Sequence, residues 1–439
     1  MRSKLITVVT AVASTLLVAH VAAADQVQEQ LQLMEQRMAE MEDRLQATSD
    51  ELAAAQATVV EQQDLLIDSG LYEDEGLRSG APGFFEQVDV SGVAAASFNH
   101  RIIEGEESTG GNDLFKNPNA NTFQLDSIWV TLDKTPTEES RGGFHAEFVV
   151  GQAAEAQISG VNGHEVGIYS AYVSYLAPIG NGVQVDLGKI PTPLGAEVVQ
   201  TNGNYFITQG ALFGLQPVVH TGVAFTTQLT DSLGFTGGIV NDVYSDTDVS
   251  GDNDKAYYGQ FQFAGDGFGL NVGGIIGDND TNSDSCNTGS SQNSVDCQVS
   301  VVDVVLTANP TDNLSLWFNY DWFHGSGRDF DGHGSIHGIS GAGRLALSDD
   351  CGVAARVEYL HMEDTLTTDP DDGNGELLTA TLTGDKTLAE GLVSRVELRY
   401  DTYLNGNNGM GFAQRGANGS GPGTRDDALV ALWQMFYEF

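Results

Sequence analysis

The sequence predicts an all-β transmembrane β-barrel of about 16 antiparallel strands, preceded by an α-helical coiled coil. A seven-residue apolar repeat near the N-terminus gives way, after the Gly/Pro break at Gly80 to Gly83, to a two-residue alternation that continues to the last residue. Short turns alternate with long polar loops throughout that second part. No stretch after the N-terminal leader approaches the ~20 consecutive apolar residues that a spanning helix needs, so strands would have to cross the membrane.

Residues 1–24 have the order of a cleavable secretory signal peptide. Arg2 and Lys4 precede an apolar run from Leu5 to Val21, and three alanines follow at the cleavage position. A retained transmembrane helix is the alternative, but polar residues interrupt the run. We therefore expect an exported protein whose mature chain begins near Asp25.

The charge balance is strongly acidic, with 61 acidic against 19 basic residues and a net charge of -42. Repulsion between like charges argues against nucleic acid as a partner. Cations or neutral solutes are the expected partners. An acidic surface that serves only solubility would give the same composition.

Residues 25–69 carry a heptad repeat typical of a coiled coil. The predicted seam residues are Leu31, Met34, Met38, Met41, Leu45, Leu52, Val59 and Leu66. A helical hairpin within one chain is the alternative, but the sequence has no second heptad segment to supply the partner. We expect these helices to associate between copies of the chain, with residues 70–86 as a linker to the barrel.

Residues 87–439 form the predicted barrel. The segment Leu392 to Tyr400 illustrates its strands, with apolar residues on one face and charged residues on the other. Turns such as Pro178 to Gly182 are short, whereas loops such as His100 to Ala120 and Ile190 to Pro217 are long. This alternation and an even number of strands are typical of closed barrels in bacterial outer membranes.

The last segment is an apolar strand that ends in an aromatic residue. Trp433, Tyr437 and Phe439 lie on one face of it, and the pattern is similar to the C-terminal assembly signal of outer-membrane proteins. The last strand of an ordinary β-sandwich is the alternative.

Several segments, in order along residues 88–439, resemble the β-barrel porin family of the OmpL-like kind. The strongest runs from Gly188 to Glu197, followed by Asn204-Tyr205 and by Pro217 to Val223. Asp242-Val243-Tyr244 departs from the family pattern, in which Gly-Trp usually follows the asparagine. The resemblance implies a porin of the outer membrane that passes small hydrophilic solutes or ions by passive diffusion.

Further expectations combine the resemblance with the acidic charge balance and with the heptad repeat, which lies outside the matched region. General porins suggest a trimer in outer-membrane lipid, with the stalk in the periplasm, where peptidoglycan or another protein could bind it. We expect a cation preference for the pore. The alternative is a structural anchor, in which a plugged barrel holds the coiled coil at the outer membrane.

Two sets of residues are the candidate pore lining. With the apolar strand faces toward lipid, alternation turns a ladder of charged side chains into the lumen. That ladder comprises Arg356, Glu358, Arg395, Glu397, Arg399 and Asp401. By resemblance to general porins, the third external loop folds inward as a constriction. Its candidate residues are Lys189, Glu197, Asn202, Asn204, Tyr205 and Gln209. Mutually neutralised wall charges and a loop that caps the mouth are the respective alternatives.

No cofactor and no metal centre are expected. Asp-rich loops such as Asp246 to Asp254 could bind Ca²⁺, but none has the EF-hand spacing. Cys286 and Cys297 suit a disulfide within one loop in an oxidising compartment, which leaves Cys351 free. We also find no nucleophile elbow, His-Glu-x-x-His or Ser/His/Asp set, so the sequence does not favour an enzyme.

Overall fold

The computed structural model describes residues 88–103, 121–157, 166–244, 255–278, 298–327, 330–363, 375–404 and 427–439. These residues belong to the second of two compact units, Gln87–Phe439. The predicted signal peptide, coiled coil and linker lie outside the described residues, as do Cys286, Cys297 and most of the Asp-rich loops. Cys351 is described and is a free thiol.

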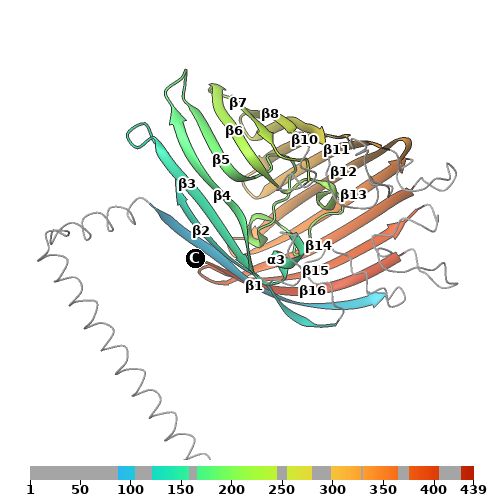
Figure 1. Cartoon of the computed structure of the whole chain (residues 1–439). Helices are drawn as coiled ribbons and strands as arrows, with labels where there is room; N and C mark the ends of the chain where they lie inside the picture. Colours follow the sequence, from blue (N-terminus) through green and yellow to red (C-terminus); the bar gives the residue numbers. More distant parts are fainter. Residues whose placement is uncertain are drawn as a thin grey trace, which may run out of the picture. The chain divides into compact units, whose positions relative to one another are not determined.

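Sixteen strands make up the described fold, and their number agrees with the prediction from the sequence (Figure 1). The first eight are β1 (Asp89–Ile103), β2 (Phe123–Lys134), β3 (Gly142–Val150), β4 (Val166–Ala177), β5 (Val183–Pro191), β6 (Val219–Thr230), β7 (Leu233–Val240) and β8 (Ala256–Ala264). The others are β9 (Phe268–Asp278), β10 (Gln298–Thr311), β11 (Leu314–Gly327), β12 (Phe330–Ser348), β13 (Cys351–Glu363), β14 (Gly375–Ala389), β15 (Leu392–Tyr403) and β16 (Asp427–Glu438).

The strands close into one antiparallel barrel in which each strand pairs with its neighbours in sequence. Closure comes from β1 and β16, whose register runs from Val93 opposite Glu438 to Ile103 opposite Leu429. The last residue completes the seam, because Gly92 and Phe439 exchange backbone hydrogen bonds of 2.9 and 3.0 Å. A barrel closed in this way leaves no unpaired strand edge.

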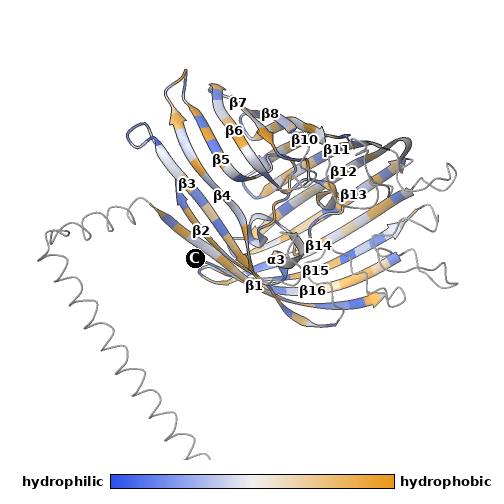
Figure 2. Ribbon diagram, viewed as in Figure 1, coloured by the Kyte–Doolittle hydropathy of each residue, from blue (hydrophilic) through white to orange (hydrophobic). Residues whose placement is uncertain are grey.

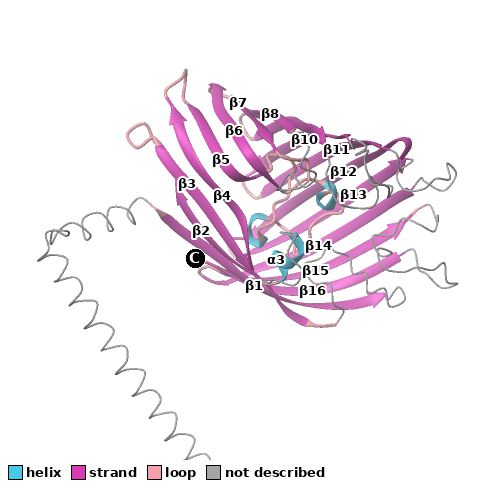
Figure 3. Cartoon of the chain, in the orientation of Figure 1, coloured by secondary structure: helices cyan, strands magenta, loops and turns pink. Residues whose placement is uncertain are grey.

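Most connections alternate in length, as the sequence predicts, although β11 ends at Gly327 and β12 already begins at Phe330, where the alternation calls for a long loop. Ala177 ends β4 and Val183 begins β5, while Ser348 ends β12 and Cys351 begins β13. The long connection between β5 and β6 is described, and it contains the short 3-10 helices η1 (Thr201–Gly203) and η2 (Phe213–Leu215). Figure 3 places this connection and helix α3 (Gln152–Gln157) among the strands rather than beyond their ends.

The two faces of the wall differ in chemistry, as the striped colouring of the strands in Figure 2 reflects. On β15, Val396 is 61% and Leu398 43% exposed, whereas Arg395, Glu397 and Arg399 between and beside them are buried. Large apolar side chains are exposed on the outer face of most strands. This exterior suits lipid, because a soluble protein rarely exposes so continuous an apolar surface.

Apolar clusters on the inner face hold the interior elements in place. Leu194 and Leu212 of the β5–β6 connection pack with Val240, Tyr258 and Phe323 of the wall. A second cluster joins Ala153 and Ala154 of α3 to Trp129, Tyr169 and Val199. No helix among the described residues is long and apolar enough to cross a membrane.

Candidate functional site: the inner loop

The connection between β5 and β6 folds into the barrel, and we call residues 192–218 the inner loop. It bonds to strands that are far apart around the wall. Gln200 donates to Glu147 on β3 at 2.8 Å, and Gln260 on β8 donates to the Pro193 carbonyl at 2.6 Å. Further bonds reach β11, β13, β15 and β16. The inner loop therefore crosses the interior and is attached on several sides.

Arg356 of β13 is the centre of the strongest attachment. Its guanidinium group forms an ion pair with Glu197 of the inner loop and donates to the Thr208 carbonyl at 2.9 Å. The same group lies 3.3 Å from Glu358 and 4.6 Å above the Phe206 ring. Burial raises the pKa of the Glu197 carboxyl, an effect that the neighbouring guanidinium group opposes. Charge-assisted bonds of this kind are stronger than neutral ones.

Two glutamates of the wall accept the backbone N–H groups of the inner loop. Glu358 accepts from Ala211 and Leu212 at 3.0 and 3.3 Å. Glu397 of β15 accepts from Ile207 and Thr208 at 2.6 and 3.0 Å, and also from the Thr208 hydroxyl. Outside the 3-10 helices η1 and η2, the N–H groups of the loop need other partners when they are buried. These carboxylates provide them.

Two arginines of β15 bind the carbonyl groups of the inner loop. Arg395 donates to the carbonyls of Thr201 and Asn204 at 3.0 and 2.7 Å. Arg399 donates to the Gln209 carbonyl and pairs with Asp401 at 2.8 Å. The ladder residues thus lie together on the inner wall and have one role in common. Their donors and acceptors pair with N–H and carbonyl groups of the inner loop.

Gly210 allows the inner loop to approach this wall. Its N–H donates to Glu197 at 2.7 Å. A Cβ atom at residue 210 would lie 2.2 Å from one oxygen of Glu358 and 2.7 Å from one of Glu197. Only glycine fits there without displacing the two carboxylates.

A second attachment lies on β11 and contains no basic group. Gln216 donates from its amide nitrogen to Asp321 at 2.5 Å and to the Asn319 side-chain oxygen at 3.1 Å. The Ala196 N–H donates to the same Asn319 oxygen at 3.1 Å. Amide and carboxyl groups therefore hold both ends of the inner loop to this part of the wall.

The structure brings five of the six predicted constriction residues into the inner loop. Asn204 is buried and binds Val198 of the same loop at 3.0 and 2.6 Å, and Gln209 donates to the Val198 carbonyl at 2.8 Å. Tyr205 is half-buried. Asn202 is exposed and donates to Glu438 of β16 at 3.1 Å. These side chains build the loop itself or fasten it, so they hold its shape.

Lys189 requires a correction. It lies in β5, opposite Ala171 and Thr221 of the neighbouring strands, and not in the inner loop. Alternation places it on the same face as Leu187, which is 59% exposed, and opposite to the buried Ile190. The side chain therefore belongs to the outer face of the barrel. The assignment from sequence was wrong because it did not apply the strand alternation as far as Pro191.

The sequence interpretation also missed the polar residues on β10 and β11. Asp303, Asn319 and Asp321 are at most 3% exposed, and all three face the inner loop. Their signal is present in the sequence, because Asn319 and Asp321 alternate with Phe318, Tyr320 and Trp322. Without knowledge of the loop, two polar residues on an inner face indicate only a polar lumen.

A group of ionisable residues that is more exposed to solvent than the attachments of the inner loop lies on the inner face of β2 to β4. His145 lies 2.9 Å from Asp133 and 3.8 Å from Glu147, and its ring stacks on Tyr172 at 5.0 Å. The Asp133 side chain is 33% exposed. No described group of three or more His, Cys, Asp or Glu residues is arranged to hold a metal ion.

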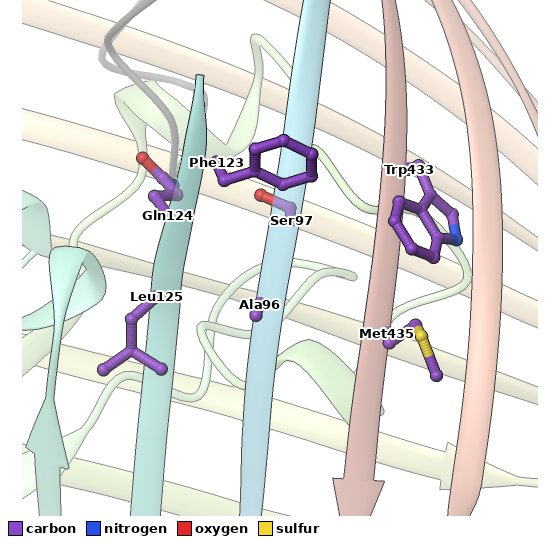
Figure 4. Close-up of a pocket in the computed structure, with 7 residues that line it drawn as sticks. All are labelled: Ala96, Ser97, Phe123, Gln124, Leu125, Trp433 and Met435. Carbon is purple, nitrogen blue, oxygen red and sulfur yellow. The ribbon is translucent and has the colours of Figure 1, made fainter. Parts of the chain in front are cut away.

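A shallow groove of about 450 Å³ lies at the seam of β1, β2 and β16 (Figure 4). Phe123, Leu125, Trp433 and Met435 line it around Ala96. Phe123 and Trp433 are 73% and 45% exposed, and both belong to the apolar outer face. The apolar residues of the groove are therefore part of the exterior, while Ser97 and Gln124, which also line it, bond to the buried Asp126.

Comparisons with known proteins agree with this architecture. A model of the family described as "putative beta-barrel porin-2, OmpL-like" matches residues 87–439. No functionally curated protein matches the chain. Among solved structures, the trimer form of the outer-membrane protein OmpT of Vibrio cholerae is similar, with a TM-score of 0.54 at 14% identity. That match covers 80% of this chain and 99% of the other.

Two further solved structures share the fold. The anion-selective porin from Comamonas acidovorans has a TM-score of 0.54 at 10% identity, covering 80% of this chain and 99% of the porin. The channel DcaP of Acinetobacter baumannii has a TM-score of 0.51 at 10% identity, covering 80% and 97%. At these identities the likeness concerns the barrel fold alone.

Proposed function

This chain belongs to the OmpL-like β-barrel porin-2 family, and on that premise we propose that it passes small hydrophilic solutes across the outer membrane by diffusion. The observation that carries the proposal is the inner loop, which enters the barrel and is bonded to the wall through Glu358 and Glu397. A loop fixed in this way narrows a water-filled barrel to a defined width. The narrowed barrel selects solutes by size without a dedicated binding step.

A preference for cations is part of the proposal. Arg356, Arg395 and Arg399 are buried against the inner loop, and their charges are engaged with its carbonyls and with carboxylates. Asp133, in contrast, remains one-third exposed on the inner face of β2. Acidic groups near the lumen raise the local concentration of cations and lower that of anions.

A trimer in outer-membrane lipid is the proposed assembly, with the coiled coil as an additional contact between copies. A similar solved structure is described as a trimer form. The exposed apolar outer face offers surface both for lipid and for neighbouring copies. The proposed periplasmic stalk would bring peptidoglycan or a periplasmic protein within reach.

The experiment that tests the function is planar-bilayer conductance of the purified, folded protein under a KCl gradient. Stable conductance steps with a cation-selective reversal potential are the expected result. A folded barrel that does not conduct would contradict the porin proposal and support the structural anchor instead. An anion-selective reversal potential would overturn only the cation preference.

Asp133→Asn tests the source of the selectivity. Removal of a charge that is exposed on the inner face should shift the reversal potential toward zero while the size of the conductance steps is kept. Asp231→Asn, in the exposed turn between β6 and β7, is the matched control and should leave both quantities unchanged. Equal reversal potentials for the parent, Asp133→Asn and Asp231→Asn would show that Asp133 is not the source of the selectivity.

A further inference from the structure

Two carboxyl groups lie side by side beneath the inner loop. Asp303 of β10 and Asp321 of β11 are directly opposite each other in the strand register, and each is 0% exposed. One nitrogen, the amide nitrogen of Asn319, lies within 2.8 Å of an oxygen of Asp303 and within 3.1 Å of an oxygen of Asp321, so the two carboxyl groups are close neighbours. Two buried carboxylates in contact are costly, because neither solvent nor a neighbouring positive charge offsets their repulsion.

The partners of this pair are all neutral. Asn319 donates from its amide nitrogen to Asp303 at 2.8 Å and to Asp321 at 3.1 Å. Gln216 donates to Asp321 at 2.5 Å. The second oxygen of Asp303 is buried without a hydrogen-bond partner in the described structure. One proton between the two carboxyl groups would supply the donor that this oxygen lacks.

The orientation of Asn319 favours a proton over a metal ion in this position. Its oxygen accepts from the Ala196 N–H and from Gln216, so its amide nitrogen must face the two carboxyl groups. A metal ion between the carboxylates would meet the hydrogens of that amide. A shared proton instead keeps every donor of Asn319 paired.

Other ionisable groups around the pair are engaged elsewhere. The inner faces of the flanking strands present Gly273 and Ile275 on β9 and Gly338 and Ser340 on β12. The ionisable groups that face this region in the described structure include Tyr244, Glu197 and Glu358, together with Tyr258, which packs in the same apolar cluster as Val301 and Phe323 and stacks on His220. The Tyr244 hydroxyl donates to the Leu215 carbonyl, while Glu197 and Glu358 are bonded to Arg356. No basic side chain contacts either aspartate among the residues described.

We propose that Asp303 and Asp321 share one proton and thereby act as a proton-dependent latch that positions the inner loop. Loss of this proton to solvent at alkaline pH leaves two adjacent negative charges. Their repulsion separates the carboxyl groups and disturbs the bond from Gln216 to Asp321 and the bond from Ala196 to the adjacent Asn319, which lie near the two ends of the inner loop. The arginine attachments on β13 and β15 remain, so the loop loosens on one side only. The effect on conductance rests on the proposed porin function.

Infrared spectroscopy of the folded barrel tests the shared proton without any need for conductance. The parent protein should show the carbonyl stretch of a buried protonated carboxylic acid at neutral pH and lose it at strongly alkaline pH. Asp321→Asn and Asp303→Asn should each lack this pH-dependent band. Asparagine resembles a protonated aspartate in shape, so both variants should fold.

Asp186→Asn is the control, because Asp186 is also buried but accepts from Ser174 at 2.6 Å and from Gln184 at 2.9 Å. It should keep the band. A band that is absent from the parent, or that persists in both latch variants, overturns the shared proton. Added Ca²⁺ or Na⁺ that raises the unfolding temperature of the parent but not of Asp321→Asn would identify a metal ion instead and also overturn it.

Conductance across the same pH range then tests the latch. The parent should change its step size or its gating noise reversibly when the infrared band is lost, and Asp321→Asn should not change there. A band that titrates without any change in conductance overturns the latch but not the porin function. A barrel that never conducts overturns the porin function and leaves the infrared result to decide on the shared proton.

Discussion

The inner loop is attached to two walls of the barrel by different chemistry. On β13 and β15 the loop meets guanidinium groups and carboxylates, such as Arg356 with Glu197, whose opposite charges compensate each other. On β10 and β11 it meets two acidic side chains and amides, with no opposite charge among the described partners. The first attachment depends on the pairing of opposite charges. The second depends on where a proton resides.

The largest expected effect comes from breaking the first attachment at its centre. Arg356→Ala leaves Glu197 and Glu358 buried without their counter-charge and removes the bond to the Thr208 carbonyl. Removal of one partner from a buried ion pair costs about 3–5 kcal/mol. We expect a clearly lower unfolding temperature, measured by circular dichroism in detergent, and greater protease cleavage within residues 192–218.

Arg344→Ala is the matched control. Arg344 is also on the inner wall and pairs with Asp385, but its side chain is 33% exposed, and within the described part of the chain no hydrogen bond joins it to the inner loop. Because solvent reaches the Arg344 side chain, its loss should cost clearly less than the loss of the fully buried Arg356. Equal losses of stability in the two variants would contradict the assignment of the main attachment to Arg356.

A smaller effect is expected when the same wall is disturbed without any change of charge. Gly210→Ala places a Cβ atom against the oxygens of Glu358 and Glu197, and overpacking of this kind costs about 1–3 kcal/mol. Thermal unfolding should shift in the same direction as for Arg356→Ala, but less. Gly384→Ala on β14 is the control, because a Cβ atom there meets no atom within 4 Å. A Gly210→Ala protein with parental stability would show that the loop is not pressed against the wall.

The smallest effect is expected outside both attachments, in the turn between β12 and β13. The Ser348 hydroxyl, followed by Lys386, lowers the pKa of the exposed Asp350 carboxyl. A lowered pKa means that the ionised carboxyl stabilises the fold above its unfolded-state pKa and that this contribution is lost as the pH falls through the folded-state pKa. Because solvent screens the site, Asp350→Asn should leave the unfolding temperature at neutral pH almost unchanged and slightly flatten its decline in acid. A large loss at neutral pH would contradict this prediction.

The barrel could be predicted from the sequence because its period is local. Alternation along β13 and β15 is enough to place Arg356 and Glu397 on the face opposite Val357 and Val396, and turn lengths are enough to count sixteen strands. The role of these charges could not be predicted in the same way. Glu397 binds the N–H of Ile207, 190 residues away in sequence, and no local pattern encodes such a contact.

The latch residues illustrate a second limit of sequence interpretation. Asp303 and Asp321 are 18 positions apart in sequence, but the turn and the strand register of β10 and β11 place them directly opposite each other. The loop that buries them comes from another part of the chain. In sequence, each is one more acidic residue in a chain with 61 of them. Their burial, which gives them an unusual property, exists only in the folded barrel.

The distance in sequence between the inner loop and its wall also constrains the order of assembly. The loop follows β5, but its main partners are on β13 and β15, and β16 must pair with β1 before the wall is complete. Contacts between residues so far apart form late and slowly. The polar groups of the loop can therefore be satisfied only as the cylinder closes around them. The loop can reach its native position only when β13 and β15 are in place, so its docking depends on late steps in the assembly of the wall.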